Sequence, residues 1–146
     1  MVSAFRIDPP TGHLVFPQLG VTLERMSQWK AMPEELRKLA GPDRDKRTGW
    51  IWRSISSLEF QSHSVGLMLG YRSERLETLY FSLAGPAWPT EAECRQEVQV
   101  LTKAMEAQLG VSLGTRGSAK FKWGNVYCSY DPKGGFTSAG INYGFR

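Results

Sequence analysis

Three consecutive segments in the middle of the chain have the apolar and polar patterns of β-strands, and in the third apolar and polar residues alternate, as in a strand that is buried on one face. The segments cover residues 50–60 (WIWRSISSLEF), 64–72 (SVGLMLGYR) and 76–84 (LETLYFSLA). The connection SERL between the last two is short enough for a tight turn only. The pattern therefore predicts an antiparallel meander of three strands.

The alternation also assigns side chains to the two faces of this sheet, because successive residues of a strand point in opposite directions. In the third segment one face receives Leu79, Phe81 and Leu83, and the other receives Thr78, Tyr80 and Ser82. We expect the sheet to have one dry face and one wetter face.

The clearest helical pattern runs from Thr90 to Leu109. Thr90 followed by Glu93 is a capping box, in which each side chain satisfies the other residue's free backbone amide, and Gly110 supplies a C-terminal stop. The apolar stripe of this helix consists of Cys94, Val98, Leu101, Met105 and Leu109. Such a stripe must be buried, and the dry face of the meander is the expected surface.

The remaining segments predict short elements at both ends of the chain. Strands are expected at AFRI, HLVF and VTL within residues 4–23, with DPPTG as a turn. Ser27 can cap a helix that extends to Leu39, although Pro33 can split it into a turn and a second helix. Residues 120–130 and 136–145 read as two final strands around the corner DPKGG, where Asp, Pro and Gly favour a hairpin turn over a phosphate-binding loop.

The fold class that follows is α+β. We expect a single domain over residues 1–146, in which an antiparallel sheet, made of the meander and a C-terminal hairpin, packs against one long and one shorter helix. A chain of 146 residues with 41% hydrophobic and 22% charged residues is long enough to bury its own core. The chain shows neither a signal peptide nor an apolar run of membrane-spanning length, which predicts a cytoplasmic protein without membrane contact.

Chemistry-bearing residues are sparse in this sequence. Its two histidines, His13 and His63, and its two cysteines, Cys94 and Cys128, show no metal-binding or redox spacing. The loop GVSLGTRGS lacks the Gly-Lys-Ser/Thr ending of a phosphate-binding loop. We therefore predict a protein that is not an enzyme and has no metal or cofactor.

Charge and aromatic residues suggest binding instead. Residues 1–115 contain 13 basic and 13 acidic residues, whereas residues 116–146 contain five basic residues and one acidic residue, so the net charge of +4 comes from the last segment. In 120–130, the alternation places Phe121, Trp123 and Tyr127 on one face and Lys120, Lys122 and Tyr130 on the other. Sheets that mix basic and aromatic residues bind single-stranded nucleic acid or proteins.

Trp50 and Trp52 share a face of the first meander strand, and the preceding polar loop, residues 41–49, has no apolar anchor. We therefore expect the loop and these tryptophans to form a partner-binding surface. Its candidate residues are Arg44, Lys46, Arg47, Trp50, Trp52 and, from the C-terminal corner, Lys133.

At DPPTGHLVFP…VTL, at LYFSL and most strongly at WGNVYCSYDPKGGFTSAGINY, the sequence resembles small bacterial immunity proteins encoded beside polymorphic or type VI secretion toxins. The resemblance implies a cytoplasmic inhibitor that binds a cognate toxin stoichiometrically. Many such toxins are basic nucleases, which favour acidic inhibitors, whereas this chain is basic at one end. Either residues 41–49 make the contact or the toxin has an acidic groove. The alternative function is a small nucleic-acid-binding module that uses the basic, aromatic C-terminal sheet.

Overall fold

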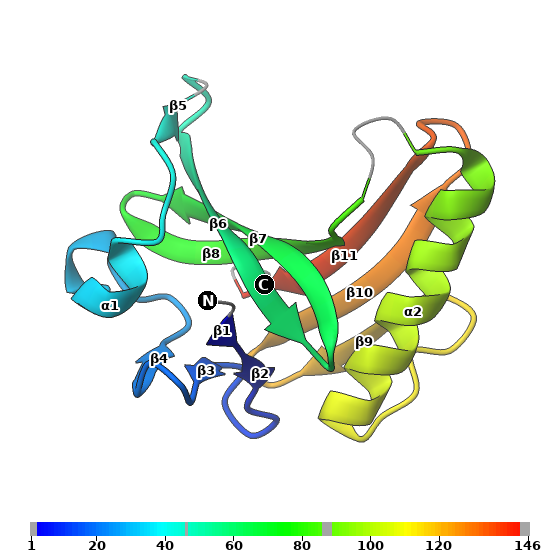
Figure 1. Cartoon of the computed structure of the whole chain (residues 1–146), viewed down its shortest axis with the longest axis horizontal. Helices are drawn as coiled ribbons and strands as arrows, with labels where there is room; N and C mark the ends of the chain where they lie inside the picture. Colours follow the sequence, from blue (N-terminus) through cyan, green and yellow to red (C-terminus); the bar gives the residue numbers. More distant parts are fainter. Residues whose placement is uncertain (1–2, 46, 86–88, 144–146) are drawn as a thin grey trace.

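The computed structural model describes residues 3–45, 47–85 and 89–143, and it confirms the antiparallel meander. Its strands are β6 (Trp50–Phe60), β7 (His63–Arg72) and β8 (Arg75–Leu83) (Figure 1). The connections are two-residue turns, Gln61–Ser62 and Ser73–Glu74, in which all four residues have positive φ. This left-handed geometry matches the twist of the hairpins, although glycine or asparagine would adopt it at lower cost.

The C-terminal strands extend the meander into one continuous sheet. They are β9 (Ser118–Phe121), β10 (Gly124–Asp131) and β11 (Phe136–Asn142). Antiparallel pairing of β11 with β8 places Gly140 opposite Tyr80 and gives the strand order β1-β6-β7-β8-β11-β10-β9. The short strands β1 (Ser3–Ala4) and β5 (Arg44–Asp45) both pair with β6, so the described residues form an eight-stranded sheet in which only β1 is parallel to its neighbour. The fold is thus α+β and dominated by its sheet.

The prediction of one continuous strand over 120–130 is wrong, because a turn at Lys122 and Trp123 separates β9 from β10. Because of this turn, the period of two that governs side-chain direction does not continue from β9 into β10. Phe121 and Trp123 stack with ring centroids 4.6 Å apart, and the buried Trp123 donates its indole N–H to the carbonyl of Pro9 at 2.8 Å. Tyr127 lies on the other face, since its neighbours Val126 and Cys128 are buried in the core.

The corner DPKGG joins β10 to β11 as a hairpin turn, as the sequence predicts. The Asp131 carboxylate accepts the backbone N–H of Lys133 at 2.9 Å, and the Asp131 carbonyl accepts that of Gly135 at 2.8 Å. Gly135 takes the positive φ, 67°, that reverses the chain. Lys133 is exposed at the tip.

The N-terminal segment forms a second, smaller sheet of strands β2 (Arg6–Ile7), β3 (Leu14–Phe16) and β4 (Val21–Leu23). The predicted turn DPPTG joins β2 to β3, and the Asp8 carbonyl accepts the backbone N–H of Gly12 at 2.7 Å. Phe5, between β1 and β2, packs its ring against Phe60 and Phe81 with centroids 5.0 and 5.9 Å away. The small sheet therefore covers one face of the meander.

The shorter helix is divided as Pro33 allows, into the 3₁₀ turn η1 (Trp29–Ala31) and the single-turn helix α1 (Glu34–Arg37). Met32 is extended, because a residue before proline avoids the helical conformation. Ser27 is not the helix cap that was expected. Its hydroxyl donates to the carbonyl of Glu24, and η1 begins after Gln28 without a side-chain cap.

The long helix α2 (Glu91–Leu109) has both hydrogen bonds of the predicted capping box and ends at Gly110 in the left-handed conformation. Its predicted position over the meander is wrong: it packs mainly on the C-terminal hairpin. Thr137 donates to the carbonyl of Cys94 at 3.1 Å, and the Cys128 thiol lies 3.6 Å from the carbonyl of Val98. The N-terminal sheet already covers much of the dry face of the meander.

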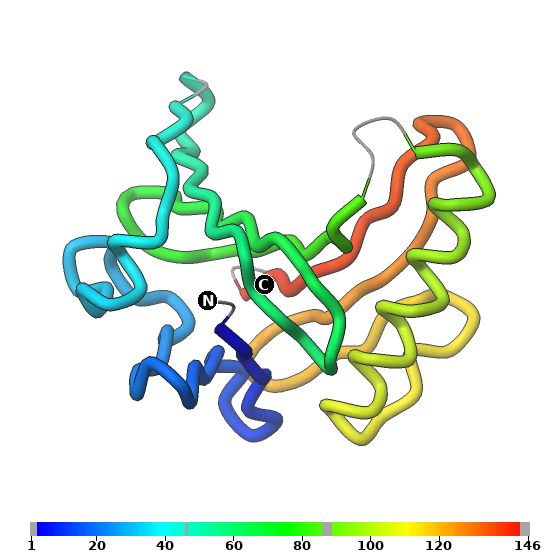
Figure 2. Tube along the Cα trace, in the orientation of Figure 1, coloured from blue at the N-terminus to red at the C-terminus, as the bar shows by residue number. Residues whose placement is uncertain are grey.

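All of these covering elements lie on one side of the main sheet (Figure 1), and the chain trace in Figure 2 follows them along the same side. The core lies between them and the sheet, with Leu14, Leu58, Leu79, Leu101 and Ile141 fully buried. The opposite side is concave. The described part of the chain contains no helix that is both long and apolar enough to cross a membrane.

Candidate functional site

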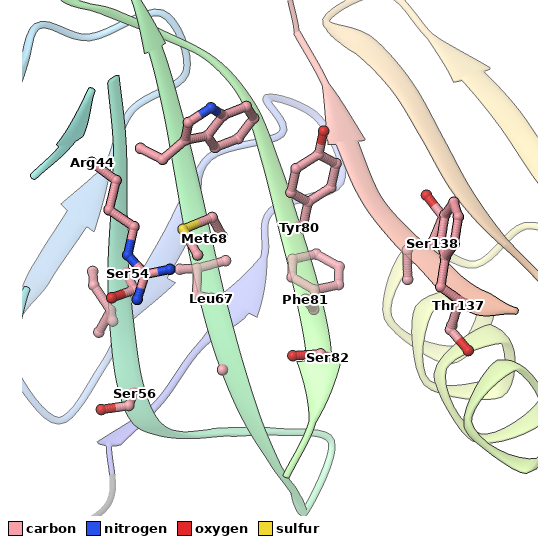
Figure 3. A pocket seen from close by; sticks show the side chains of 15 residues that line it. Arg44, Ser54, Ser56, Leu67, Met68, Tyr80, Phe81, Ser82, Thr137 and Ser138 are labelled. Atoms are coloured by element: carbon pink, nitrogen blue, oxygen red, sulfur yellow. The ribbon is translucent and has the colours of Figure 1, made fainter. Parts of the chain in front are cut away.

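The concave side of the main sheet, called here the concave face, carries side chains on which no helix or second sheet of the described residues packs. They alternate with core residues along β6, β7, β8 and β11. The concave face includes Trp50, Trp52, Ser54, Gly66, Met68, Gly70, Tyr80, Ser82, Phe136 and Ser138. Most of the positions away from the aromatic rings are small, and they leave a cavity of about 650 Å³ (Figure 3). Pockets for small ligands and side chains have roughly 300–1,000 Å³.

Three aromatic rings form a continuous stack across this face. The rings of Trp50 and Trp52 are 5.7 Å apart at an interplanar angle of 18°, and those of Trp52 and Tyr80 are 5.2 Å apart at 16°. Trp52 is on β6 and Tyr80 on β8, so the indole must cross β7. Gly70 makes this possible, because a β-carbon there would lie 2.5 Å from the indole of Trp52.

The stack borders a fourth ring on the C-terminal half of the sheet. A β-carbon at Gly140 would lie 3.1 Å from the hydroxyl of Tyr127, so this hydroxyl lies over the strand between β8 and β10. Burial raises the pKa of Tyr127, and the nearby Tyr80 raises it further. Hydrogen bonds with the side chains of Thr78 and Ser138 lower the pKa in turn, so this hydroxyl already has partners on the sheet.

The rim of the cavity is made by two side chains from distant parts of the chain. Arg44 on β5 is the cross-strand partner of Trp52, so it shares the face of that tryptophan, and Figure 3 shows its guanidinium group extended over Ser54. Phe136 begins β11 beside the hairpin turn and is 52% exposed, and Tyr80 between them is 40% exposed. Large aromatic side chains with this exposure are the unusual feature of the face.

Behind Trp52, on the opposite face of β6, Arg53 is buried with 3% of its surface exposed. Its guanidinium carbon lies 4.2 Å from the ring centroid of Trp29 and 4.8 Å from that of Tyr71. It also binds the Asp43 carboxylate, through Nε at 2.9 Å and Nη2 at 3.1 Å. Because Asp43 directly precedes Arg44, Arg53 holds β5 beside the cavity.

The structure brings three of the six sequence-predicted site residues together: Arg44, Trp50 and Trp52. Arg47 is exposed on the outer loop, and Lys133 is exposed at the hairpin tip, and neither lines the cavity. Lys46 lies outside the described residues.

Sequence reasoning missed Tyr80, Met68 and Phe136 as site residues. A signal for Tyr80 was present, because alternation already placed it opposite Leu79 and Phe81. Met68 gave no such signal, since β7 is apolar at nearly every position. Phe136 joins the cavity only through the pairing of β11 with β8, which is not encoded locally.

The other chemistry-bearing residues are dispersed. His13 accepts the backbone N–H of Arg25 at 3.2 Å beside the small sheet, whereas His63 is exposed at the start of β7. Both cysteines are free and buried, and burial raises the pKa of the Cys128 thiol. No group of three potential metal ligands occurs among the described residues.

Comparison with known proteins adds no relatives: no family model, no curated protein and no solved structure matches this chain.

Proposed function

We propose that this chain is an immunity protein that binds a cognate secreted bacterial toxin, of the type VI or a related system, in the cytoplasm of the producing cell. The observation that carries the proposal is the partly exposed stack of Trp50, Trp52 and Tyr80 on a concave sheet face. The toxin binds this face and is neutralised by stoichiometric contact.

The rings suit this role because they are already held in place. Tryptophan, tyrosine and arginine contribute most to the binding energy of protein interfaces, especially near the centre of a concave contact. Trp52 is held between Trp50 and Tyr80, and the Arg72 guanidinium group lies 5.2 Å from the ring centroid of Trp50. A partner therefore loses little affinity to the ordering of these side chains.

Co-expression with the product of the adjacent gene tests the proposal. The pair should form a stable complex and restore growth, and Tyr80→Ala should weaken the complex about tenfold or more, as expected for an aromatic hot spot. Arg47→Ala is the matched control on the outer loop and should leave affinity unchanged. Absence of both a complex and growth rescue would refute the function, and equal losses in the two variants would refute the assigned face.

The alternative, a nucleic-acid-binding module in the C-terminal sheet, has weaker support. Phe121 and Trp123 stack on each other at the edge of the core, and Trp123 is buried, so they offer little ring surface to bases. Lys120 and Lys122 are exposed. If the alternative holds, labelled single-stranded oligonucleotides bind at low salt, and their affinity falls steeply as salt rises.

A further inference from the structure

Arg44 is a charged residue at the edge of an otherwise uncharged cavity. The other lining residues comprise hydroxyl, apolar and aromatic side chains, and no carboxylate lines the cavity within the described part of the chain. No acidic side chain among the described residues lies within ion-pairing distance of Arg44. Its charge is therefore available to a partner.

The carboxylates nearest in sequence are directed elsewhere. Asp43 pairs with the buried Arg53 on the opposite face of β6, at 2.9 and 3.1 Å. The Asp45 carboxylate accepts the backbone N–H of Arg47 at 2.8 Å. Meanwhile the pairing of Arg44 with Trp52 fixes its backbone beside the cavity. The fold thus separates Arg44 from its acidic neighbours and directs it toward the cavity.

The surroundings of Arg44 favour a carboxylate attached to an apolar group. Ser54 and Ser56 provide hydroxyl donors on β6, and Met68 and Tyr80 provide apolar surface across the cavity (Figure 3). Phe136 on β11 also lines the cavity with apolar surface. A guanidinium group forms strong, charge-assisted hydrogen bonds with a carboxylate. A nucleic acid strand would need a row of cations along its backbone, whereas one arginine lines this cavity among the described residues.

We infer that the cavity binds an acidic segment of the partner protein, in which an Asp or Glu carboxylate pairs with Arg44 and an adjacent apolar side chain packs on Trp52 and Tyr80. The inference rests on the proposed function for the identity of the partner. The inference also explains how a basic immunity protein recognises its toxin. The contact requires an acidic segment on the toxin, and it does not require the immunity protein to be acidic.

Two short peptides test the chemistry of the cavity without the toxin: acetyl-Phe-Glu-Phe-amide and its Gln counterpart. Binding is followed through the indole N–H signals of the five tryptophans in NMR spectra of the labelled protein. The Glu peptide should shift the Trp52 signal and bind about tenfold more tightly than the Gln peptide. Arg44→Gln should remove this preference, whereas Arg47→Gln, the matched control, should keep it.

Equal affinity of the two peptides, or no shift of Trp52 with either, would overturn the inference. So would an acidic preference that survives Arg44→Gln. A single-stranded oligonucleotide that displaces the Glu peptide and binds more tightly would also overturn it, in favour of a nucleic acid ligand.

The complex with the adjacent gene product separates this inference from the proposed function. If Tyr80→Ala weakens the complex and Arg44→Gln does not, the function stands and the acidic contact is wrong. If no complex forms although the Glu peptide binds in an Arg44-dependent manner, the toxin assignment is wrong and the site chemistry stands.

Discussion

On the two faces of β6, adjacent residues lie in environments opposite to those that charged and aromatic side chains usually occupy. Arg53, a charged residue, is 3% exposed on the core face, whereas Trp50 and Trp52 remain partly exposed on the concave face. Arg53 is tolerated inside because Trp29, Tyr71 and Asp43 surround its guanidinium group. Trp52 remains partly exposed because, in the part of the chain that the structure describes, no helix or second sheet packs above it.

This difference shows that the covering elements decide burial more than the hydrophobicity of each residue does. On the core face, η1, the small sheet and α2 cover the strands. On the concave face, the partly exposed rings stack on one another, and the Arg72 guanidinium group lies beside Trp50. The toxin contact proposed above would cover this aromatic stack.

Leu79 and Tyr80, neighbours on β8, give the largest test of the contrast. Leu79 is fully buried, so Leu79→Ala should lower the free energy of unfolding by about 3 kcal/mol. Tyr80→Ala should lower it by about 1 kcal/mol or less, because the ring loses only a stacking contact on an open face. Urea unfolding of both variants measures the difference, and equal costs would mean that the concave face contributes to the core.

The second-largest loss of stability is expected for substitution of Arg53. Arg53→Ala removes a buried ion pair and two cation–π contacts, and we expect a loss of about 2 to 3 kcal/mol in the free energy of unfolding. Arg47→Ala is the control, because Arg47 is exposed and should cost no more than about 0.5 kcal/mol. If the two variants are equally stable, the arrangement around Trp29 does not stabilise the fold.

Gly70 and Gly66, on the same face of β7, test how the ring stack is accommodated. A β-carbon at Gly70 meets Trp52 at 2.5 Å and Thr78 at 2.7 Å, whereas one at Gly66 meets only the Ser82 hydroxyl at 3.8 Å. Gly70→Ala should cost about 1 to 2 kcal/mol and shift the Trp52 indole signal in NMR spectra. Gly66→Ala should do neither, and an unmoved Trp52 signal in Gly70→Ala would contradict the stacked arrangement.

Glu93 provides the smallest test, at the start of the helix that covers the core face. Hydrogen bonds from Thr90 hold the pKa of this exposed carboxyl below its ordinary value of 4.5, so ionised Glu93 stabilises the folded state. This stabilisation is present above the ordinary pKa and is lost as pH falls through the lowered value. Unfolding at pH 7 and at acid pH should therefore show a difference between wild type and Glu93→Gln that shrinks in acid.

Part of this fold could be predicted from local sequence signals. Strand-like segments within residues 50–84 identified the meander, and the pair Thr90 and Glu93 marked the start of α2, because both signals depend on residues close together in the chain. The break at Lys122 and Trp123 was not predicted, although the turn residues Gly124 and Asn125 follow it directly. The surface on which α2 packs was predicted wrongly, because an apolar stripe does not specify its partner.

The candidate site divides in the same way. The sequence by itself determined that Trp50 and Trp52 share a face and that Tyr80 lies opposite Leu79, because a strand has a period of two. Only the tertiary structure decided that this face stays uncovered, that Gly70 lets Trp52 reach Tyr80, and that Asp43 turns away from Arg44. These features depend on contacts between strands and on competition among covering elements, and the local order of residues does not encode either one.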